Sequence, residues 1–237
     1  MRILVMDGSA TGTQARAVIA CLVLGDDGVL SVLATREATG RGAAEQFPLL
    51  ATELFAQCGW THVMPELVGV VVGPGSFTGL RASLAFAHGL AAGSGCAVMG
   101  MTGGEAMADA LRHLARQQAA RPVCCTVARR GRVFVEMLAD GDGAGSVSAH
   151  MLDMLELPPG PLLLAGNAAE DVAQALSRRM DVRTCKLMQP DPVGIATVAL
   201  RRFRGHLPPR AAQPLYVDAP EAKLPAAGLR PAPTDTP

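Results

Sequence analysis

The segment of this chain best suited to chemistry is a glycine-rich turn that joins an apolar run to a helical pattern. The β-branched run from Leu67 to Val72 is followed by Gly73-Pro74-Gly75, and helix-forming residues begin at Ser76. This order predicts a strand, a tight turn and a helix N-terminus. Free backbone N–H groups and the positive end of the helix dipole would then meet at the carboxyl edge of a sheet, where phosphates and carboxylates bind in many α/β proteins.

The details of this turn count against a nucleotide site. No Lys-Ser or Lys-Thr pair follows Gly79, so the turn is not a Walker A loop. The GxGxxxG pattern from Gly73 to Gly79 loosely resembles the dinucleotide fingerprint, which also needs an acidic residue at the end of the following strand. That strand ends at Met99-Gly100-Met101, without an acid. A nucleotide-binding enzyme that uses Gly73–Gly79, either an NADP oxidoreductase or a sugar or acyl kinase, therefore stays an alternative hypothesis.

The helix predicted over residues 76–92 is crowded with small side chains. Leucines and alanines at helical spacing can face the sheet, whereas another side is nearly bare, with Ala82, Ala85, Gly89 and Ala92. A glycine inside a helix, such as Gly79 or Gly89, costs about 1 kcal/mol relative to alanine. A cost of that size suggests that another backbone approaches closely. The residues alone leave open whether that backbone belongs to this chain or to a partner.

Few other residues have a spacing suited to catalysis or metal binding. Asp7 ends the first predicted strand, where it could hold Mg²⁺ or orient water in a phosphotransferase, or cap a strand-end turn. The six cysteines show no CxxC spacing and the five histidines no HxxxH pair, so no metal site is predicted. Two arginine clusters could contact RNA phosphates or simply be solvated turns and helix ends. They are Arg129, Arg130 and Arg132, and Arg201, Arg202, Arg204 and Arg210.

The composition predicts a protein with a large core and no general attraction to nucleic acid. The chain has 237 residues, of which 49% are hydrophobic and 18% charged, so it can form one large domain or two small ones. Its formal net charge is zero, which excludes whole-surface attraction to RNA or DNA. No run approaches the ~20 apolar residues of a membrane span, and Asp7 interrupts the first apolar stretch too early for a signal peptide. The cysteine pattern fits a reduced, cytoplasmic protein.

The order of predicted elements suggests a duplication. The first half reads β-β-β-α-β-α-β over residues 2–7, 17–24, 29–35, 43–57, 67–72, 76–92 and 96–101. The second half is predicted to begin with a helix from a capping box at Thr102 to about Gln118. Strands are then predicted over 122–128 and 133–139, with a further strand after the 141–145 turn. A strand over 162–165, a helix over 167–179, a strand over 182–187 and a helix from Asp191-Pro192 to about Phe203 complete this half. From Leu207 onward the chain carries eight of its 17 prolines, which predicts a surface segment with a disordered end.

Several segments together resemble one protein family. The nine residues Gly73-Pro74-Gly75-Ser76-Phe77-Thr78-Gly79-Leu80-Arg81 are similar to the signature of the TsaB family, also called YeaZ. Members of this family are partner proteins in the biosynthesis of threonylcarbamoyladenosine in tRNA. Further segments agree in order: Ile3–Ser9, Gly42–Glu45 with Pro48, Ala128–Phe134 and Pro214–Pro220. The resemblance spans about residues 2–225.

The resemblance implies an α/β protein of the actin/Hsp70-like (ASKHA) fold, built from two RNase H-like subdomains that each have a mixed sheet flanked by helices. The implied division is an N-terminal domain over 1–103, a C-terminal domain over 104–205, and a proline-rich tail over 206–237 that packs partly on the N-terminal domain. The alternative kinase hypothesis would be of the same ASKHA type.

The family also implies a function for this chain. It would be a non-catalytic scaffold subunit that binds a TsaD-like transferase, with a TsaE-like ATPase joining the pair and tRNA reached through the complex. It would need no cofactor of its own, since ATP or ADP would be bound mainly by partners. Whether the chain forms a homodimer when it is alone stays an open question. The implied partner interface comprises Glu45, Gln46, Leu49, Glu53, Ser76, Phe77, Thr78, Arg81, Ala82, Ala85, His88, Gly89 and Ala92. Arg129, Arg130 and Arg132 are the candidates for RNA contact.

Four positions depart from the family pattern. The chain has Gly8 where threonine is common, Ala43 where histidine is common, Val127 where aspartate is common, and Asp218 where arginine is common. The first three changes remove groups that a nucleotide pocket or a metal site would use. They therefore fit a scaffold better than an enzyme.

Overall fold

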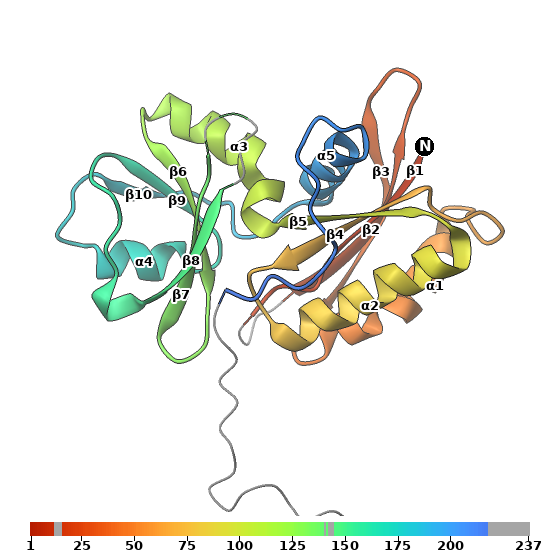
Figure 1. Ribbon diagram of the computed structural model, residues 1–237, viewed down its shortest axis with the longest axis horizontal. Helices are drawn as coiled ribbons and strands as arrows, with labels where there is room; N and C mark the ends of the chain where they lie inside the picture. The colour runs from red at the N-terminus through yellow and green to blue at the C-terminus, as the bar shows by residue number, and fades with distance from the viewer. Residues whose placement is uncertain (12–15, 140, 142–144, 218–237) are drawn as a thin grey trace, which may run out of the picture.

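The computed structural model describes residues 1–11, 16–139, 141 and 145–217, which form two halves built on separate sheets (Figure 1). The strands of the first sheet are β1 (Arg2–Asp7), β2 (Arg16–Leu24), β3 (Leu30–Thr39), β4 (Leu67–Gly73) and β5 (Ala97–Thr102). Their order is β3-β2-β1-β4-β5. The pairs β1–β2 and β2–β3 are antiparallel, whereas β1–β4 and β4–β5 are parallel.

The second sheet repeats this topology. Its strands are β6 (Arg121–Val127), β7 (Arg132–Met137), β8 (Ser146–Met151), β9 (Leu162–Ala165) and β10 (Val182–Thr184). Their order is β10-β9-β6-β7-β8, with antiparallel β6–β7 and β7–β8 pairs and parallel β6–β9 and β9–β10 pairs. The predicted fold class, two subdomains each with a mixed sheet flanked by helices, is confirmed.

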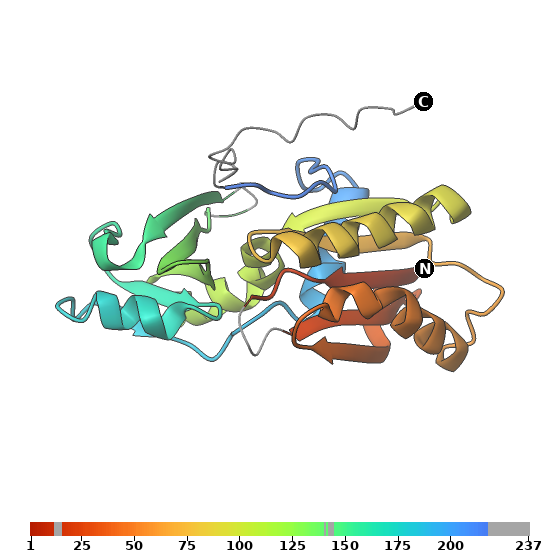
Figure 2. The same ribbon diagram turned by 90° about the horizontal axis from the view of Figure 1, so that it is seen from below.

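Helices cover both faces of each sheet. The 3₁₀ helix η1 (Ala43–Gln46), α1 (Phe47–Gln57) and α2 (Phe77–Ser94) pack on one face of the first sheet, as Figures 1 and 2 show, and α5 (Pro192–Phe203) packs on the other. In the second half, α3 (Gly103–Gln117) and α4 (Ala169–Ala175) lie on opposite faces, and η2 (Leu152–Met154) follows β8. No helix in the described ranges is long and apolar enough to cross a membrane.

The packing of β1 explains why its apolar run is continuous. Leu4 and Met6 face the core beneath α1 and α2, whereas Ile3 and Val5 face the core beneath α5. A strand covered on both faces needs apolar residues at every position, not only at alternate ones. The same reasoning applies to β4, which is buried along its whole length.

Packing places α5 differently from the domain division derived from the sequence. That division put residues 104–205 in the C-terminal domain, but Ile195 and Ala199 of α5 share a core with Ile3 and Leu67 of the first sheet. The following segment also joins the first half, since the Leu215 N–H donates to the Val72 carbonyl oxygen at 2.8 Å. The open face of the first sheet needs an apolar cover, and the chain supplies it from 90 residues beyond β5, a distance that local patterns do not reveal.

Local boundaries differ from the prediction where a helix or strand is short. The helix predicted over 43–57 divides into η1 and α1, with Pro48 in the first turn of α1. Proline has no N–H, so it cannot continue a hydrogen-bonded helix that started before it. The helix predicted over 167–179 is limited to α4, and the strand predicted over 182–187 to β10. The sequence also predicted a disordered end of the proline-rich tail, and the residues concerned lie outside the described ranges.

Candidate functional site

The turn before α2 uses its own backbone N–H groups internally. Gly73 has a φ of 129°, a conformation that favours glycine, and the Gly73–Pro74 peptide is cis. Ser76 is the N-cap of α2, and its side chain accepts a hydrogen bond from the Gly79 N–H at 3.2 Å. The Ser76 N–H donates in turn to the Ser9 carbonyl oxygen at 2.7 Å. Two N–H groups at the N-terminus of α2, those of Ser76 and Gly79, are therefore already bonded within the chain.

The two glycines that attract attention in α2 have different surroundings. A Cβ added at Gly79 would collide with the carbonyl oxygen of Gly8, and a Cβ added at Gly8 would lie 2.7 Å from the Gly79 carbonyl oxygen and 2.8 Å from the Cβ of Ala44. Position 79 thus needs glycine because another part of this chain approaches it. Among the residues that the structure describes, a Cβ added at Gly89 or Gly93 would meet no atom within 4 Å beyond the adjoining backbone of α2. Packing among the described residues does not explain those two glycines.

Around Gly89, α2 presents a row of small exposed residues. We call the exposed residues Thr78, Ala85, Gly89 and Ala92 the α2 seam. Helical geometry at 100° per residue puts all four on one side of α2. All thirteen residues predicted for the partner interface are exposed or half-buried, and Ser76 and Ala82 are the half-buried ones.

Two borders limit the α2 seam. On one side the segment 211–217 runs along α2 (Figure 2), since His88 Nε2 lies 2.7 Å from the Ala212 carbonyl oxygen and Arg81 Nε donates to the Tyr216 hydroxyl at 3.1 Å. The Arg81 guanidinium also stacks 3.7 Å above the Phe77 ring. On the other side lies α1, whose predicted interface residue Leu49 is 63% exposed.

Asp7 serves as a turn cap in this structure. It is buried, and its Oδ1 accepts the Ser9 N–H at 2.8 Å. Burial raises the pKa of the Asp7 carboxyl, an effect that hydrogen bonding to Ser9 partly opposes. Beyond it, the Thr11 hydroxyl donates to the Val127 carbonyl oxygen at 2.8 Å and so links the two halves. Among residues 1–11, 16–139, 141 and 145–217, no group of three His, Cys, Asp or Glu side chains is placed to hold a metal ion.

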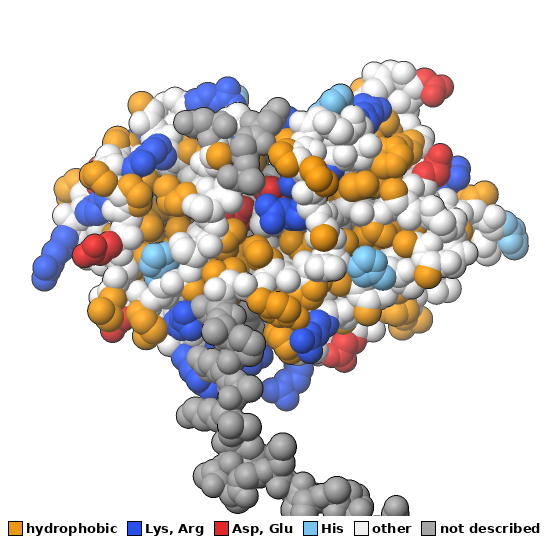
Figure 3. Space-filling model, in the orientation of Figure 1, with side chains coloured by type: hydrophobic (Ala, Val, Ile, Leu, Met, Phe, Trp, Pro, Cys, Tyr) orange, Lys and Arg blue, Asp and Glu red, His pale blue; other side chains and the backbone are white. Residues whose placement is uncertain are grey.

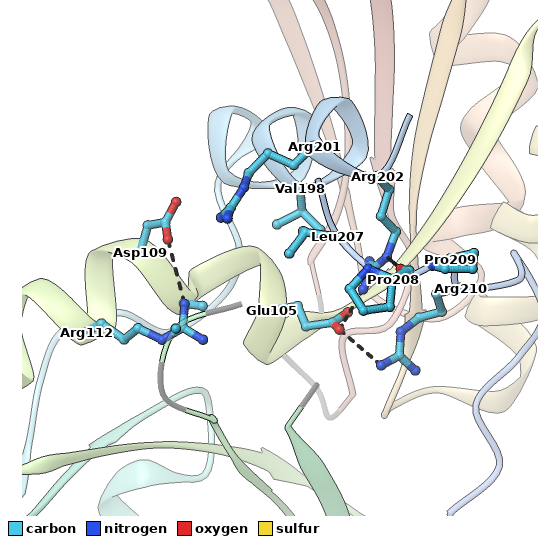
Figure 4. Close-up of a pocket in the computed structure, with 12 residues that line it drawn as sticks. Glu105, Asp109, Arg112, Val198, Arg201, Arg202, Leu207, Pro208, Pro209 and Arg210 are labelled. Carbon is cyan, nitrogen blue, oxygen red and sulfur yellow. Dashed lines mark hydrogen bonds and ion pairs between the residues drawn. The ribbon is translucent and has the colours of Figure 1, made fainter. Parts of the chain in front are cut away.

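The two arginine clusters of the sequence lie in different settings. Arg129 and Arg130 are exposed on the turn between β6 and β7, with Arg130 in the left-handed region at a φ of 59°. Arg201, Arg202 and Arg210 instead line a cavity of about 220 Å³ between α3, α5 and the segment that follows α5 (Figure 4). The structure therefore separates groups that looked alike in sequence.

A buried ionic cluster at this cavity was missed by reasoning from the sequence. Glu105 Oε1 accepts from Arg202 at 2.7 Å and from Arg210 at 3.0 Å. Burial alone would raise the pKa of Glu105, but the hydrogen bond from Arg202 and the charges of Arg202 and Arg210 hold it below its usual value. Arg202 also donates to the Gly100 and Pro208 carbonyl oxygens at 2.7 and 2.9 Å. Only the capping role of Glu105 was visible in the sequence, through its spacing from Thr102.

Glu136 completes the connection to the second sheet. This buried residue of β7 accepts hydrogen bonds from the Thr102 hydroxyl and, at 2.9 Å, from the Gly104 N–H at the start of α3. Burial raises the pKa of the Glu136 carboxyl to about 7, and the nearby charge of Glu105 acts in the same direction. A Cβ at position 104 would collide with this carboxylate, which explains the glycine there.

Comparisons with known proteins agree with this geometry. Residues 36–139 match a family model described as TsaD: tRNA N6-adenosine threonylcarbamoyltransferase. No curated protein matches the chain by sequence comparison. The fold resembles that of YeaZ from Pseudomonas aeruginosa, with a TM-score of 0.66 and 19% identity over 91% of this chain and 99% of that one.

A second solved structure agrees with the first. It is an uncharacterized protein with similarity to peptidase YeaZ from Pseudomonas aeruginosa, with a TM-score of 0.67 and 19% identity over 92% of this chain and 99% of that one. The chain therefore has the YeaZ fold over nine-tenths of its length, and its residues 36–139 match the TsaD family model.

Proposed function

We propose that this chain is a non-catalytic scaffold subunit that binds a TsaD-like transferase and so supports threonylcarbamoylation of adenosine 37 in tRNA. The proposal is supported by the family match over residues 36–139, which covers α1, α2 and the strands β4 and β5. A TsaE-like ATPase would join the pair, and ATP or ADP would be held mainly by the partners.

The observation that carries the proposal is the open surroundings of Gly89. Glycine inside a helix costs about 1 kcal/mol relative to alanine, yet a Cβ built at position 89 would meet no described atom within 4 Å apart from its chain neighbours and the adjoining backbone of α2. A partner helix that packs closely on the α2 seam would account for that cost. Burial of a standard interface of about 1,600 Å² across α1 and α2 would then provide the association energy.

The alternative, a nucleotide-binding enzyme that uses Gly73–Gly79, has less support in this geometry. The N–H groups that a phosphate would need at Ser76 and Gly79 already donate to Ser9 and to the Ser76 side chain. Asp7, the last residue of β1, is buried, and its carboxylate accepts a hydrogen bond from the Ser9 N–H. These contacts favour the scaffold over the enzyme.

Replacement of Ala85 by arginine tests the proposed interface. Ala85 is exposed at the centre of the α2 seam, so Ala85→Arg should leave the fold intact but place a long charged side chain between two closely packed helices. We expect wild-type protein to form a 1:1 complex with the TsaD-like protein of the same organism in sedimentation velocity, and the variant to bind at least tenfold more weakly.

Ala110→Arg provides the matched control, because Ala110 is an exposed alanine in the middle of α3. It should bind the partner as wild type does. A complex of equal strength with both variants would show that the interface lies elsewhere, and no complex of the wild-type chain, with or without ATP, would overturn the scaffold proposal.

A further inference from the structure

The N-terminal end of α2 carries an exposed cluster of two aromatic rings and one guanidinium. The ring centroids of Phe77 and Tyr216 lie 5.7 Å apart, and the guanidinium carbon of Arg81 lies 3.7 Å from the Phe77 centroid and 5.9 Å from the Tyr216 centroid. Phe77 is 46% exposed and Tyr216 is 54% exposed. We call these three residues the anchor cluster. Figure 3 shows hydrophobic and basic side chains side by side over this end of α2.

The anchor cluster is built from two parts of the chain that are far apart in sequence. Arg81 belongs to α2, whereas Tyr216 belongs to the segment 211–217. The Leu215 N–H donates to the Val72 carbonyl oxygen at 2.8 Å, so this segment is fixed one residue before Tyr216. The Arg81 Nε then donates to the Tyr216 hydroxyl at 3.1 Å. Side chains that are already held in place lose little conformational freedom when a partner covers them, which favours binding.

Arg81 keeps hydrogen-bonding capacity that the described part of the chain does not use. Its Nε is bonded to Tyr216, and among the described residues the guanidinium has no carboxylate partner and no second acceptor. Arg81 is also the only Lys, Arg, Asp or Glu in α2. A guanidinium that becomes buried needs acceptors for its remaining N–H groups, and a carboxylate that accepts two parallel hydrogen bonds is the best match.

We propose that the anchor cluster holds the TsaD-like partner, with an apolar side chain of the partner on the two rings and a partner carboxylate on Arg81. This inference rests on the proposed scaffold function. It adds Tyr216, and with it the segment 211–217, to an interface so far drawn only on residues 45–53 and 76–92. Tyrosine and arginine are enriched where truncation to alanine most weakens a complex, and the contacts around such residues contribute little.

The anchor cluster would also fix how a partner helix is aligned along the α2 seam. Arg81 precedes Ala85 by one helical turn, so the cluster lies beside the N-terminal part of the seam. The seam repeats small side chains at Ala85, Gly89 and Ala92, and a partner helix displaced by one turn would meet much the same surface. Bulky rings and a charge at one end distinguish the correct alignment from a displaced one, as single polar residues do in coiled coils.

The test compares variants for their affinity toward the TsaD-like protein of the same organism, measured by sedimentation velocity. Phe77→Ala and Tyr216→Ala should each bind about thirtyfold more weakly than wild type. Arg81→Met removes the N–H donors and should also lose affinity, whereas Arg81→Lys should retain part of it. Phe203→Ala is the matched control, because Phe203 in α5 is 47% exposed and lies outside the proposed interface. It should bind as wild type does, and thermal melts confirm that each variant folds.

Chemical modification of Tyr216 tests the same contact in the wild-type chain. Tyr216 is the only tyrosine of the sequence, and its exposure should let tetranitromethane nitrate it readily in the free protein. Because solvent is excluded from the centre of an interface, we expect nitration of the peptide that carries Tyr216 to be about tenfold slower in the complex. Mass spectrometry measures the rate. Protection by tRNA without the partner would assign the rings to a nucleobase and overturn the inference.

The acids of this chain provide a further control. Asp218 and Glu221 follow Tyr216 in sequence and lie outside the described ranges. Asp218→Asn/Glu221→Gln should bind the partner as wild type does, and a loss equal to that of Arg81→Met would assign the acceptor of Arg81 to this chain and overturn the inference.

The outcomes separate this inference from the scaffold proposal. Wild-type affinity in Phe77→Ala and Tyr216→Ala, an equal loss in Phe203→Ala, or unchanged nitration in the complex would overturn the anchor cluster while the scaffold proposal stands. A wild-type chain that forms no complex would overturn both.

Discussion

At the scale of single residues, Glu136 is the group whose surroundings matter most. It is buried between the two sheets and fastens β7 to the N-terminus of α3 through Thr102 and Gly104. Its folded-state pKa of about 7 lies above the usual 4.5 of glutamate. The folded protein therefore holds this proton more tightly than the unfolded chain does. Stability is gained at low pH and declines as the pH rises from about 4.5 to 7.

Glu136→Gln should remove this pH dependence. We expect the free energy of unfolding of wild type to fall by on the order of 3 kcal/mol more than that of the variant between pH 4.5 and pH 7. Urea titrations at several pH values measure the difference. Asp7 contributes equally to the pH dependence of stability in both proteins and therefore cancels in the comparison. The control variant Glu156→Gln, at an exposed position, should keep the wild-type dependence of the free energy of unfolding on pH. Parallel curves for wild type and Glu136→Gln would contradict the assignment.

At the scale of elements, α2 shows that glycines in one helix can serve opposite purposes. Gly79 lets the backbone of Gly8 approach and so belongs to the fold, whereas no other described element approaches Gly89. Gly79 lies in the first turn of α2, whereas Gly89 lies in the helix interior, where glycine costs about 1 kcal/mol relative to alanine. The difference in purpose lies in what is packed against each one, inside the chain for Gly79 and, by the scaffold proposal, outside it for Gly89.

Alanine at the two positions separates these purposes. Gly79→Ala should destabilise the chain by about 1–3 kcal/mol, because its methyl group would collide with the Gly8 carbonyl oxygen. Gly89→Ala should stabilise it by about 0.5–1 kcal/mol and at the same time weaken binding of the TsaD-like partner. Thermal melts and sedimentation velocity give both numbers. Equal destabilisation by both changes would falsify the distinction.

At the scale of the whole molecule, Arg202 ties together parts that are far apart in sequence. From α5 it reaches Gly100 in β5, Glu105 in the first turn of α3, and Pro208 in the segment after α5. Its side chain is only 4% exposed. Loss of the guanidinium would leave buried oxygens without donors at the point where the two halves and the tail meet.

Arg202→Leu should therefore destabilise the protein by about 3 kcal/mol, which corresponds to a fall in Tm of roughly 6–12 °C for a chain of this size. Differential scanning calorimetry measures it. Arg204→Leu is the control, since Arg204 is the exposed C-cap of α5, two residues after Arg202. If the two variants have the same Tm, the hydrogen bonds and ion pair of Arg202 do not stabilise the protein.

The sequence predicted local features well and long-range ones poorly. The capping box of Thr102 and Glu105 and the N-cap at Asp191 are confirmed, because each depends on residues three positions apart. The contact of Glu136 with Thr102 and the packing of α5 on the first sheet depend on residues 34 to about 190 positions apart. Eleven of the thirteen predicted interface positions are exposed and two are half-buried, but the distinction between Gly79 and Gly89 required the three-dimensional structure.

The position of α5 has a consequence for synthesis on the ribosome. The strands of the first sheet are complete at Thr102, yet the helix that covers their second face ends at Phe203. At about 5–20 residues per second, that cover arrives roughly 5–20 s later. During this interval the apolar side chains of Ile3, Val5 and Leu67 lack their partners, whereas the strands of the second sheet come from the continuous stretch 121–184. The half that is made first is thus the last to be finished, and a nascent chain stalled before residue 192 would offer chaperones an unfinished sheet.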